Sequence, residues 1–125
     1  MKIIPDEFGT LAITAYGDGW IEINGNRQQS SVLISSNGHQ ESLSICNISE
    51  LSVANFQCLG DLSIDIALLG TGSQQHFVSP NLLVPLMTKG IGFESMSTAA
   101  ACRTFNVLAS EGRKVGALLC LSAKN

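Results

Sequence analysis

The chain contains 125 residues, of which 45% are hydrophobic and 14% are charged, and this composition excludes an intrinsically disordered protein. Its length fits a single domain and is too short for two independent hydrophobic cores. The formal net charge is −3 and no cluster of Lys and Arg occurs, so the sequence indicates no nucleic-acid partner.

The first third of the chain predicts an antiparallel β meander. Ile21 and Ile23 alternate with polar neighbours, which places both on the buried face of a strand. Asn24 and Gly25 supply the two positive φ positions of a type I′ turn, so we expect a hairpin whose return strand ends at residues 32–34. The sequence YGDG marks an earlier turn of the same meander.

The middle of the chain carries weaker secondary-structure signals. Residues 35–40 (SSNGHQ) have the composition of a loop, and residues 43–48 are expected to form a strand. A short helix is expected over residues 49–56, with Ser49 as its N-cap. The apolar run 64–69 has the length of a strand, and its composition predicts a strand that is covered on both faces.

The second half of the chain predicts strands that alternate with helices. After the strand 64–69 the expected elements are a helix from Ser79-Pro80 to Gly90, a strand over 91–96, a helix from a cap at Ser97 or Thr98 to about residue 111, and a strand over 115–121. A β-α-β-α-β order with short connections favours a largely parallel sheet with right-handed crossovers. The predicted fold is therefore a mixed α/β domain over residues 1–125, with the antiparallel meander beside or against that sheet.

A glycine-containing loop, Gly70-Thr71-Gly72, follows an expected strand, as a phosphate-binding loop would. It lacks the Lys of a Walker loop and the third glycine of a dinucleotide-binding fingerprint. Two interpretations remain open. The glycines allow a tight turn in which strand and helix approach closely, or the backbone N–H groups line a site for an anion or carboxylate.

The long expected helix carries one polar stripe and one apolar face. The stripe comprises Arg103, Asn106, Ser110 and Arg113, and the apolar face comprises Ala101, Phe105 and Leu108. An ordinary solvated stripe would favour Lys and Glu, so Arg and Asn indicate a fixed partner. That partner is either structural, with Arg103 pairing with Glu94 or binding carbonyls of the Gly70–Gly72 loop, or a ligand or protein.

The sequence indicates no catalytic residue, no metal ion and no cofactor. No cysteine pair has metal-ligand spacing, and we expect reduced, mostly buried thiols. Cys102 lies beside Arg103, and a nearby cation lowers a thiol pKa only where the sulfur is partly exposed. His39 and His76 lie in expected loops with no acid at relay spacing, and the carboxylates are scattered.

Three stretches of the chain together resemble one known family. They are YGDGWIEINGNRQQSSVLI, LLGTG with Phe77 and Pro80, and GIGFESMSTAAACRTFNVLASEGRKVGALL. They are similar to the small uncharacterised family of bacteria and archaea that also contains mitochondrial NADH:ubiquinone oxidoreductase (complex I) assembly factor 3. The segments ACRTFN and EGR are the most specific. The chain departs from the family at Ser97, where Asp is usual, and at Gln28, where an aromatic residue is common.

The resemblance implies a single three-layer β/β/α domain without established catalytic activity, and a protein partner in respiratory-complex or membrane-protein assembly. The start of the chain, MKIIPDEFGT, has acidic residues and a proline instead of the pattern of a signal or transit peptide. We therefore expect a bacterial, cytoplasmic protein. No apolar run approaches the roughly 20 residues that cross a bilayer, so no membrane span is expected.

Two functional hypotheses from different classes follow. The first is a non-catalytic binding or assembly module that docks another protein through the helix stripe or the hairpin face. The second is a small-molecule or anion binder, or an unrecognised enzyme, that uses the Gly70–Gly72 loop with Arg103 and Asn106. The candidate ligand- or partner-binding residues are Gly70, Thr71, Gly72, Glu94, Thr98, Cys102, Arg103 and Asn106.

Overall fold

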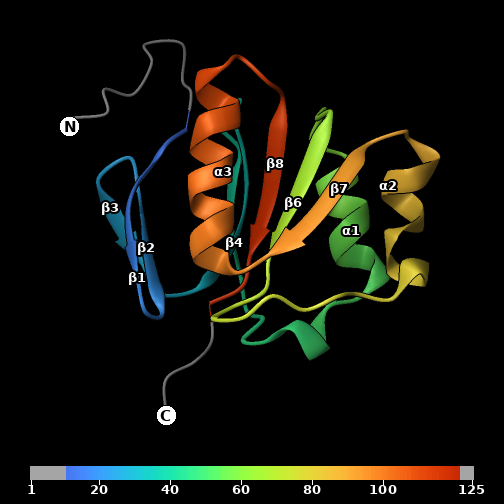
Figure 1. Cartoon of the computed structure of the whole chain (residues 1–125), viewed down its shortest axis with the longest axis horizontal. Coiled ribbons are helices and arrows are strands. Elements are labelled where there is room, and N and C mark those ends of the chain that lie inside the picture. Colours follow the sequence, from blue (N-terminus) through green and yellow to red (C-terminus); the bar gives the residue numbers. More distant parts are fainter. Residues whose placement is uncertain (1–10, 122–125) are drawn as a thin grey trace.

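Two sheets and three α-helices make up residues 11–121, the part of the chain that the computed structural model describes (Figure 1). The strands are β1 (Ile13–Gly17), β2 (Trp20–Ile23), β3 (Asn26–Gln28), β4 (Ser31–Ser35), β5 (Gln40–Leu43), β6 (Ile66–Gly70), β7 (Gly92–Met96) and β8 (Val115–Leu119). The helices are α1 (Val53–Gly60), α2 (Val84–Thr88) and α3 (Thr98–Ser110), with 3₁₀ turns η1 (Ile48–Glu50) and η2 (Pro80–Leu83). The first sheet has the order β1-β2-β3, and the second has the order β5-β4-β8-β6-β7.

The five-stranded sheet is the central layer, and both of its faces are covered (Figure 1). Leu68 of β6 belongs to the buried cluster that contains Phe105 of α3 and Ile21 of β2. Its neighbour Leu69 belongs to the cluster on the other face, which contains Phe56 of α1. The expectation that this strand is covered on both faces is confirmed. Three layers result, with α3 and the three-stranded sheet sharing one outer layer.

The strand directions follow the predicted arrangement of the second half of the chain. β6 runs parallel to both β7 and β8, as the β-α-β-α-β order predicts. β4 runs antiparallel to β8 and to β5, so strands from the first half extend the same sheet. The mixed α/β fold is therefore confirmed. Within residues 11–121, no helix combines the length and the apolar character that crossing a bilayer would need.

The hairpin of the meander is confirmed at its turn and corrected at its end. Asn24 and Gly25 have φ values of 49° and 88°, which are the two left-handed positions of a type I′ turn. The return strand β3 ends at Gln28, however, and residues 32–34 belong to β4 in the other sheet. The apolar run 32–34 is buried on both sides, which a central strand requires and an edge strand of a small sheet cannot provide.

The middle of the chain differs from the expectation in its boundaries. β5 spans Gln40–Leu43 instead of residues 43–48, and the helix expected over 49–56 is divided into η1 and α1. The capping residues explain the division. Asn47 accepts from the Ser49 backbone N–H at 3.0 Å and begins η1, and Ser52 precedes α1.

The ends of α3 are set by a cap and a glycine. Ser97 accepts a hydrogen bond from the Ala100 backbone N–H at 3.3 Å, so Ser97 performs the capping role despite the departure from Asp. The helix ends at Ser110, and Gly112 follows with a φ of 79°. Arg113 therefore lies beyond the helix and does not extend its polar stripe.

Candidate functional site

α3 places Arg103 beside the three-stranded sheet. The Arg103 Nη1 donates a hydrogen bond to the Tyr16 hydroxyl at 3.0 Å, and both side chains are exposed. The structural alternative, in which Arg103 pairs with Glu94 or with carbonyls of the Gly70–Gly72 loop, is not found among the contacts of residues 11–121. The next residue, Thr104, is the one that faces β7, and it donates to the Met96 sulfur at 3.5 Å. Successive helix residues point about 100° apart, so Arg103 turns away from β7.

The Asn106 side chain binds backbone instead of facing a cleft. Its Oδ1 accepts from the Ile13 N–H at 2.9 Å, and its Nδ2 donates to the Ile13 carbonyl at 2.7 Å. Both contacts are partly buried and join α3 to β1. The amide therefore has a structural partner in β1.

The Gly70–Gly72 loop forms a tight connection to the start of α3. The Thr71 N–H donates to the Met96 carbonyl at 2.8 Å, and the Gly72 N–H donates to the Thr98 hydroxyl at 2.8 Å. A Cβ on Gly70 would lie 3.0 Å from the Thr98 Cα, so the close approach requires glycine there. Thr71 and Gly72 use these N–H groups within the fold, which favours the tight-turn interpretation.

The Thr98 hydroxyl is a buried junction between the loop, α3 and β8. It donates to the Cys120 carbonyl at 2.7 Å while it accepts from Gly72. Its own backbone N–H donates to the Gly72 carbonyl at 2.8 Å. Donor and acceptor of the hydroxyl are therefore both satisfied by protein groups.

The two buried thiols are held in the protonated form. Burial raises the pKa of Cys102 to about 12, and the charge of Arg103 offsets only part of that effect. Burial, followed by the charge of Glu50, raises the pKa of Cys120 to about 11. Cys46 and Cys58 are exposed, and all four cysteines are free. The condition for a reactive Cys102, partial exposure of the sulfur, is not met.

A cleft of about 410 Å³ opens at the N-terminal end of α3. Its walls come from residues Tyr16, Gly17, Asp18, Gly19, Ile21, Gly72, Ser73, Thr98, Ala99, Cys120 and Leu121. The cleft thus brings together Gly72 and Thr98 from the candidate set, with Arg103 bound to Tyr16 of the same wall. Asp18 of the β1–β2 turn contributes to the same lining.

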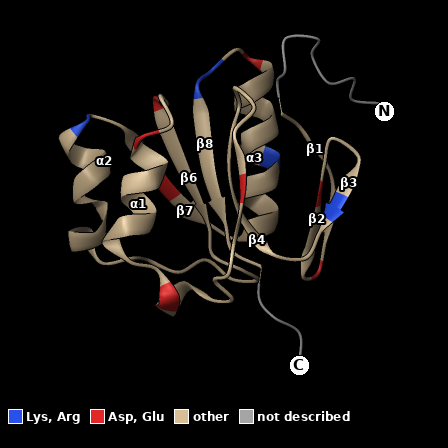
Figure 2. Cartoon of the chain, turned by 180° about the vertical axis from the view of Figure 1, so that it is seen from behind, with Lys and Arg blue, Asp and Glu red and all other residues tan. Residues whose placement is uncertain are grey.

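Glu94 lies apart from the cleft, on the outermost strand of the five-stranded sheet. It is the acidic residue of β7, and Figure 2 shows the charged residues of the chain scattered over several elements. Its register partner is Leu68 of β6, so both side chains leave the sheet on the α3 side. The Glu94 side chain is exposed and forms no ion pair within residues 11–121.

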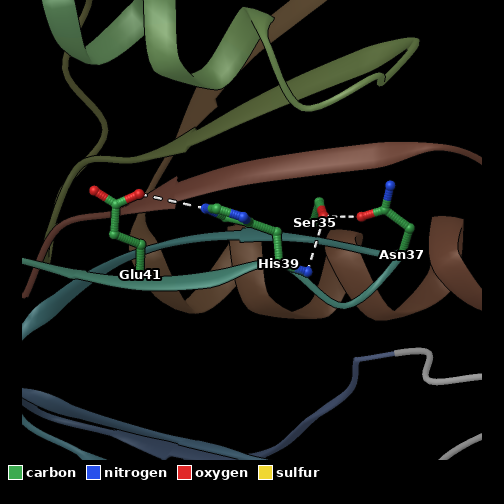
Figure 3. A network of polar contacts seen from close by, with 4 residues as sticks. All are labelled: Ser35, Asn37, His39 and Glu41. Carbon is green, nitrogen blue, oxygen red and sulfur yellow. Dashed lines mark hydrogen bonds and ion pairs between the residues drawn. The ribbon is translucent and has the colours of Figure 1, made fainter.

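Ser35, His39 and Glu41 lie together at the turn between β4 and β5 but do not form a catalytic triad (Figure 3). The His39 Nε2 lies 3.3 Å from the Glu41 Oε1, so His39 does have a nearby acid, contrary to the sequence-based expectation. The Ser35 hydroxyl donates to Asn37 and accepts from the His39 backbone N–H at 3.2 Å. A triad requires the imidazole to accept the serine proton, whereas here the serine contacts the backbone.

Residues 11–121 contain no group of three or more His, Cys, Asp or Glu side chains that could hold a metal ion. The family described as "Protein of unknown function (DUF498/DUF598)" matches residues 13–120. The chain belongs to this family. The match includes α3, the Gly70–Gly72 loop and every strand from β1 to β8.

The DUF498/DUF598 domain has relatives in bacteria and in mammals. An uncharacterised protein of Rhodobacter capsulatus is 34% identical over 115 residues, which cover 92% of this chain and 88% of that protein. Bovine NADH dehydrogenase [ubiquinone] 1 alpha subcomplex assembly factor 3 is 33% identical over 117 residues. The match covers 87% of this chain and spans 60% of the length of the bovine protein.

Solved structures share the fold of this DUF498/DUF598 domain. A crystal structure of a Bordetella parapertussis protein superimposes with a TM-score of 0.87 at 33% identity, covering 93% of this chain and 99% of that chain. A solution structure of a Bordetella pertussis protein, described as a Mth938-like domain, gives a TM-score of 0.84 at 27% identity. That match covers 100% of this chain and 94% of the other.

Sequence reasoning missed the residues that form the hairpin wall of the cleft. Tyr16 and Asp18 were interpreted only as part of a turn, although both line the cleft with Gly72 and Thr98. The wall and the loop are far apart in the sequence, and only the packing of the small sheet against α3 joins them. Tyr16 itself lies in β1, before the turn.

Proposed function

We propose that this protein is a non-catalytic module that binds another protein, acting in the assembly of a respiratory or other membrane-protein complex. The observation that carries the proposal is the exposure of three apolar side chains in the connection between β6 and β7. Phe77, Val84 and Met87 are 88%, 53% and 66% exposed. Removing such side chains from water lowers the free energy by roughly 25 cal/mol per Å² of apolar surface buried. A complex in which a protein partner covers them is therefore stabilised.

The placement of these side chains supports a docking surface. Val84 and Met87 are three residues apart on α2, so they lie on one side of that helix. α2 lies on the opposite side of the five-stranded sheet from α3 and the three-stranded sheet (Figure 1). We call Phe77, Val84 and Met87 the apolar stretch. It is separate from the cleft at the start of α3.

The relatives support an assembly role. The mammalian relatives are named as assembly factors of NADH dehydrogenase, and they share about a third of their aligned residues with this chain. The polar side chains that a reaction would use support the same proposal, because Asn106 and Thr98 are bound to protein groups. The protonated thiols of Cys102 and Cys120 are poor nucleophiles at neutral pH.

The proposed location is the cytoplasm. All four cysteines are free, which is the usual state of thiols in a reducing compartment. Two of them, Cys46 and Cys58, are exposed, and an oxidising compartment favours the pairing or modification of exposed thiols.

Site-specific photo-crosslinking in the native organism tests the protein-binding proposal. A photoreactive phenylalanine analogue replaces Phe77, and in a matched control it replaces Val107, an exposed apolar residue of α3. The proposal predicts one discrete cross-linked protein from position 77 and none from position 107. Identical products from both positions, or no product from position 77, would contradict it.

The cleft supports a second candidate function, the binding of a small molecule. Its volume of about 410 Å³ falls within the roughly 300–1,000 Å³ that ligand pockets occupy. A ligand there would meet Gly72, Thr98 and Tyr16, with Arg103 beside it. A thermal-shift screen with anions, nucleotides and neutral metabolites tests this function, with Ala99→Leu narrowing the cleft. A shift that Ala99→Leu abolishes would support ligand binding, and the absence of any shift would contradict it.

A further inference from the structure

We propose that the outer edge of β7 is a docking site for an extended segment of a partner protein that carries a Lys or Arg opposite Glu94. The inference rests on the proposed function, because it names the surface and the chemistry through which the partner binds. β7 is the last strand of the five-stranded sheet in the described part of the chain, so one of its edges has no neighbouring strand. Such an edge accepts a further strand through main-chain hydrogen bonds.

The backbone of β7 shows which groups are available. The Gly92 N–H donates to the carbonyl of Asp65, the residue before β6, at 3.0 Å. The Met96 carbonyl accepts from the N–H of Thr71, the residue after β6, at 2.8 Å. In a parallel strand, the backbone N–H and C=O groups of alternate residues point to the same edge. The backbone groups of Glu94, two residues from Gly92 and from Met96, therefore also point to β6. The N–H and C=O groups of Phe93 and Ser95 therefore point outward. No turn, loop or cap hydrogen bond of residues 11–121 uses them.

The β7 edge lacks the usual protection against strand addition. The pairing with β6 is regular over all five residues from Gly92 to Met96, without a bulge. Natural edges are commonly protected by proline, by bulges or by several charges, and β7 has only one charged residue, Glu94. The edge is therefore a regular template with a single charge at its centre.

The two segments that carry the apolar stretch adjoin the ends of β7. At the start of β7, the Ile91 N–H donates to the Leu86 carbonyl of α2 at 3.0 Å. Near its end, the Gln75 side chain donates to the Ser95 hydroxyl at 3.2 Å. The connection that carries Phe77 thus adjoins one end of β7, and α2 adjoins the other. A strand added to β7 would lie between these two segments.

The charge of Glu94 selects the partner. Consider a second copy of the chain that pairs with β7 in the antiparallel direction. The outward N–H and C=O groups of both residues are hydrogen-bonded only in the register that pairs Phe93 with Ser95 of the other copy. That register places the two Glu94 residues directly opposite each other, with Cα atoms about 4.5 Å apart. Like charges directly opposite are destabilising, whereas opposite charges stabilise a strand pair. The edge therefore favours a different protein with a basic residue at that position.

The opposite faces of β7 set the rest of the partner pattern. Phe93 faces the α1 side, where its ring meets Phe56 edge-on at a centroid distance of 6.0 Å and an interplanar angle of 72°. One neighbour of the basic residue would lie beside Phe93 on that face, and its other neighbour would lie beside Ser95. The fitting segment thus carries an apolar residue next to its basic residue.

The test uses the protein itself as the strand donor. An equimolar mixture of the wild-type chain and Glu94→Lys places opposite charges across the edge in the register described above. Sedimentation equilibrium should show a heterodimer in the mixture, while wild type alone remains monomeric. Ser95→Pro removes one outward N–H and should abolish the heterodimer. Ser42→Pro, on β5 at the other edge of the sheet, is the matched control and should leave it unchanged.

The inference is overturned if the mixture stays monomeric, if the wild-type chain alone dimerises through β7, or if the dimer survives Ser95→Pro. A protein cross-linked from position 77 should also be lost in Ser95→Pro and in Glu94→Lys. If that partner persists in both variants, the edge inference fails and the proposed function stands. If no partner is captured while the mixture dimerises, the edge accepts a strand and the proposed function fails.

Discussion

The side-chain amide of Asn106 binds the backbone N–H and carbonyl of Ile13 at 2.9 and 2.7 Å, as a residue of a neighbouring strand would. β1 is an edge strand of the small sheet, and Asn106 satisfies both backbone groups of one of its residues. α3 therefore holds the small sheet in position and blocks that edge from further pairing. An amide side chain suits this position because it offers an N–H donor and a carbonyl acceptor on two separate atoms.

Removal of the Asn106 amide should destabilise the fold. Asn106→Ala leaves the N–H and C=O of Ile13 unpaired in a partly buried position, and we expect a loss of about 1–3 kcal/mol. Urea denaturation measures the effect, with Ser110→Ala on the exposed side of α3 as the control at within about 0.5 kcal/mol. Equal effects of the two changes would show that the amide does not hold β1.

Arg103 should contribute little to stability. Its contact with the Tyr16 hydroxyl is exposed, so we expect Arg103→Ala and Tyr16→Phe each to cost less than about 1 kcal/mol. The double variant should cost about as much as either single change, because both remove the same hydrogen bond. A loss above roughly 3 kcal/mol in Arg103→Ala would indicate a structural partner that this account lacks.

The close approach of Gly70 to α3 should exclude any larger residue. In Gly70→Ala the new Cβ would lie 3.0 Å from the Thr98 Cα and 3.1 Å from a Leu119 methyl group, and we expect a loss of about 1–3 kcal/mol. Gly92→Ala is the control, because its nearest atom is 3.8 Å away and its cost should stay within about 0.5 kcal/mol. Thermal melts of both variants decide whether backbone packing is the reason for glycine.

Only the two exposed thiols should react in the folded protein. Cys46 and Cys58 are exposed, whereas Cys102 and Cys120 are buried with pKa values raised to about 12 and 11. A thiol reagent at pH 8 should therefore titrate two thiols in the native state and four after denaturation. Rapid native reaction of Cys102 would contradict the burial.

The same two thiols give stability a definite pH dependence. The raised pKa values mean that the folded state keeps its protons above about pH 9, where the unfolded chain begins to lose them. This contribution to stability is fully present below about pH 9 and is lost as the pH rises through about 11 to 12. In Cys102→Ala the alkaline loss of stability should be smaller than in the wild-type chain.

Local signals predicted much of the fold. Asn24-Gly25 specified its turn because positive φ at two positions is a local requirement, and the three parallel strands followed from the β-α-β-α-β pattern. The run 32–34 was assigned to the wrong sheet because an apolar strand does not reveal its neighbours. Its partners, β5 and β8, are fixed only when the whole sheet assembles.

The candidate site was less predictable, because its contacts join distant segments. Arg103 meets Tyr16 across 87 residues, and Asn106 meets Ile13 across 93 residues. Helical spacing identified both polar side chains but gave no information about which strand lies beside them. The exposure of Met87 gave no sequence signal either, since apolar residues in a short helix are usually buried.

The affinity of the cross-linked partner for single-residue variants tests the proposed protein-binding role most directly. Met87→Ser removes an exposed apolar side chain of the apolar stretch, and Val107→Ser makes a matched change on α3. The account predicts a Kd at least about tenfold weaker for Met87→Ser, equivalent to about 1.4 kcal/mol, and a Kd within about twofold of wild type for Val107→Ser. An unchanged Kd for Met87→Ser together with a weakened Kd for Val107→Ser would place the partner on α3 and contradict the account.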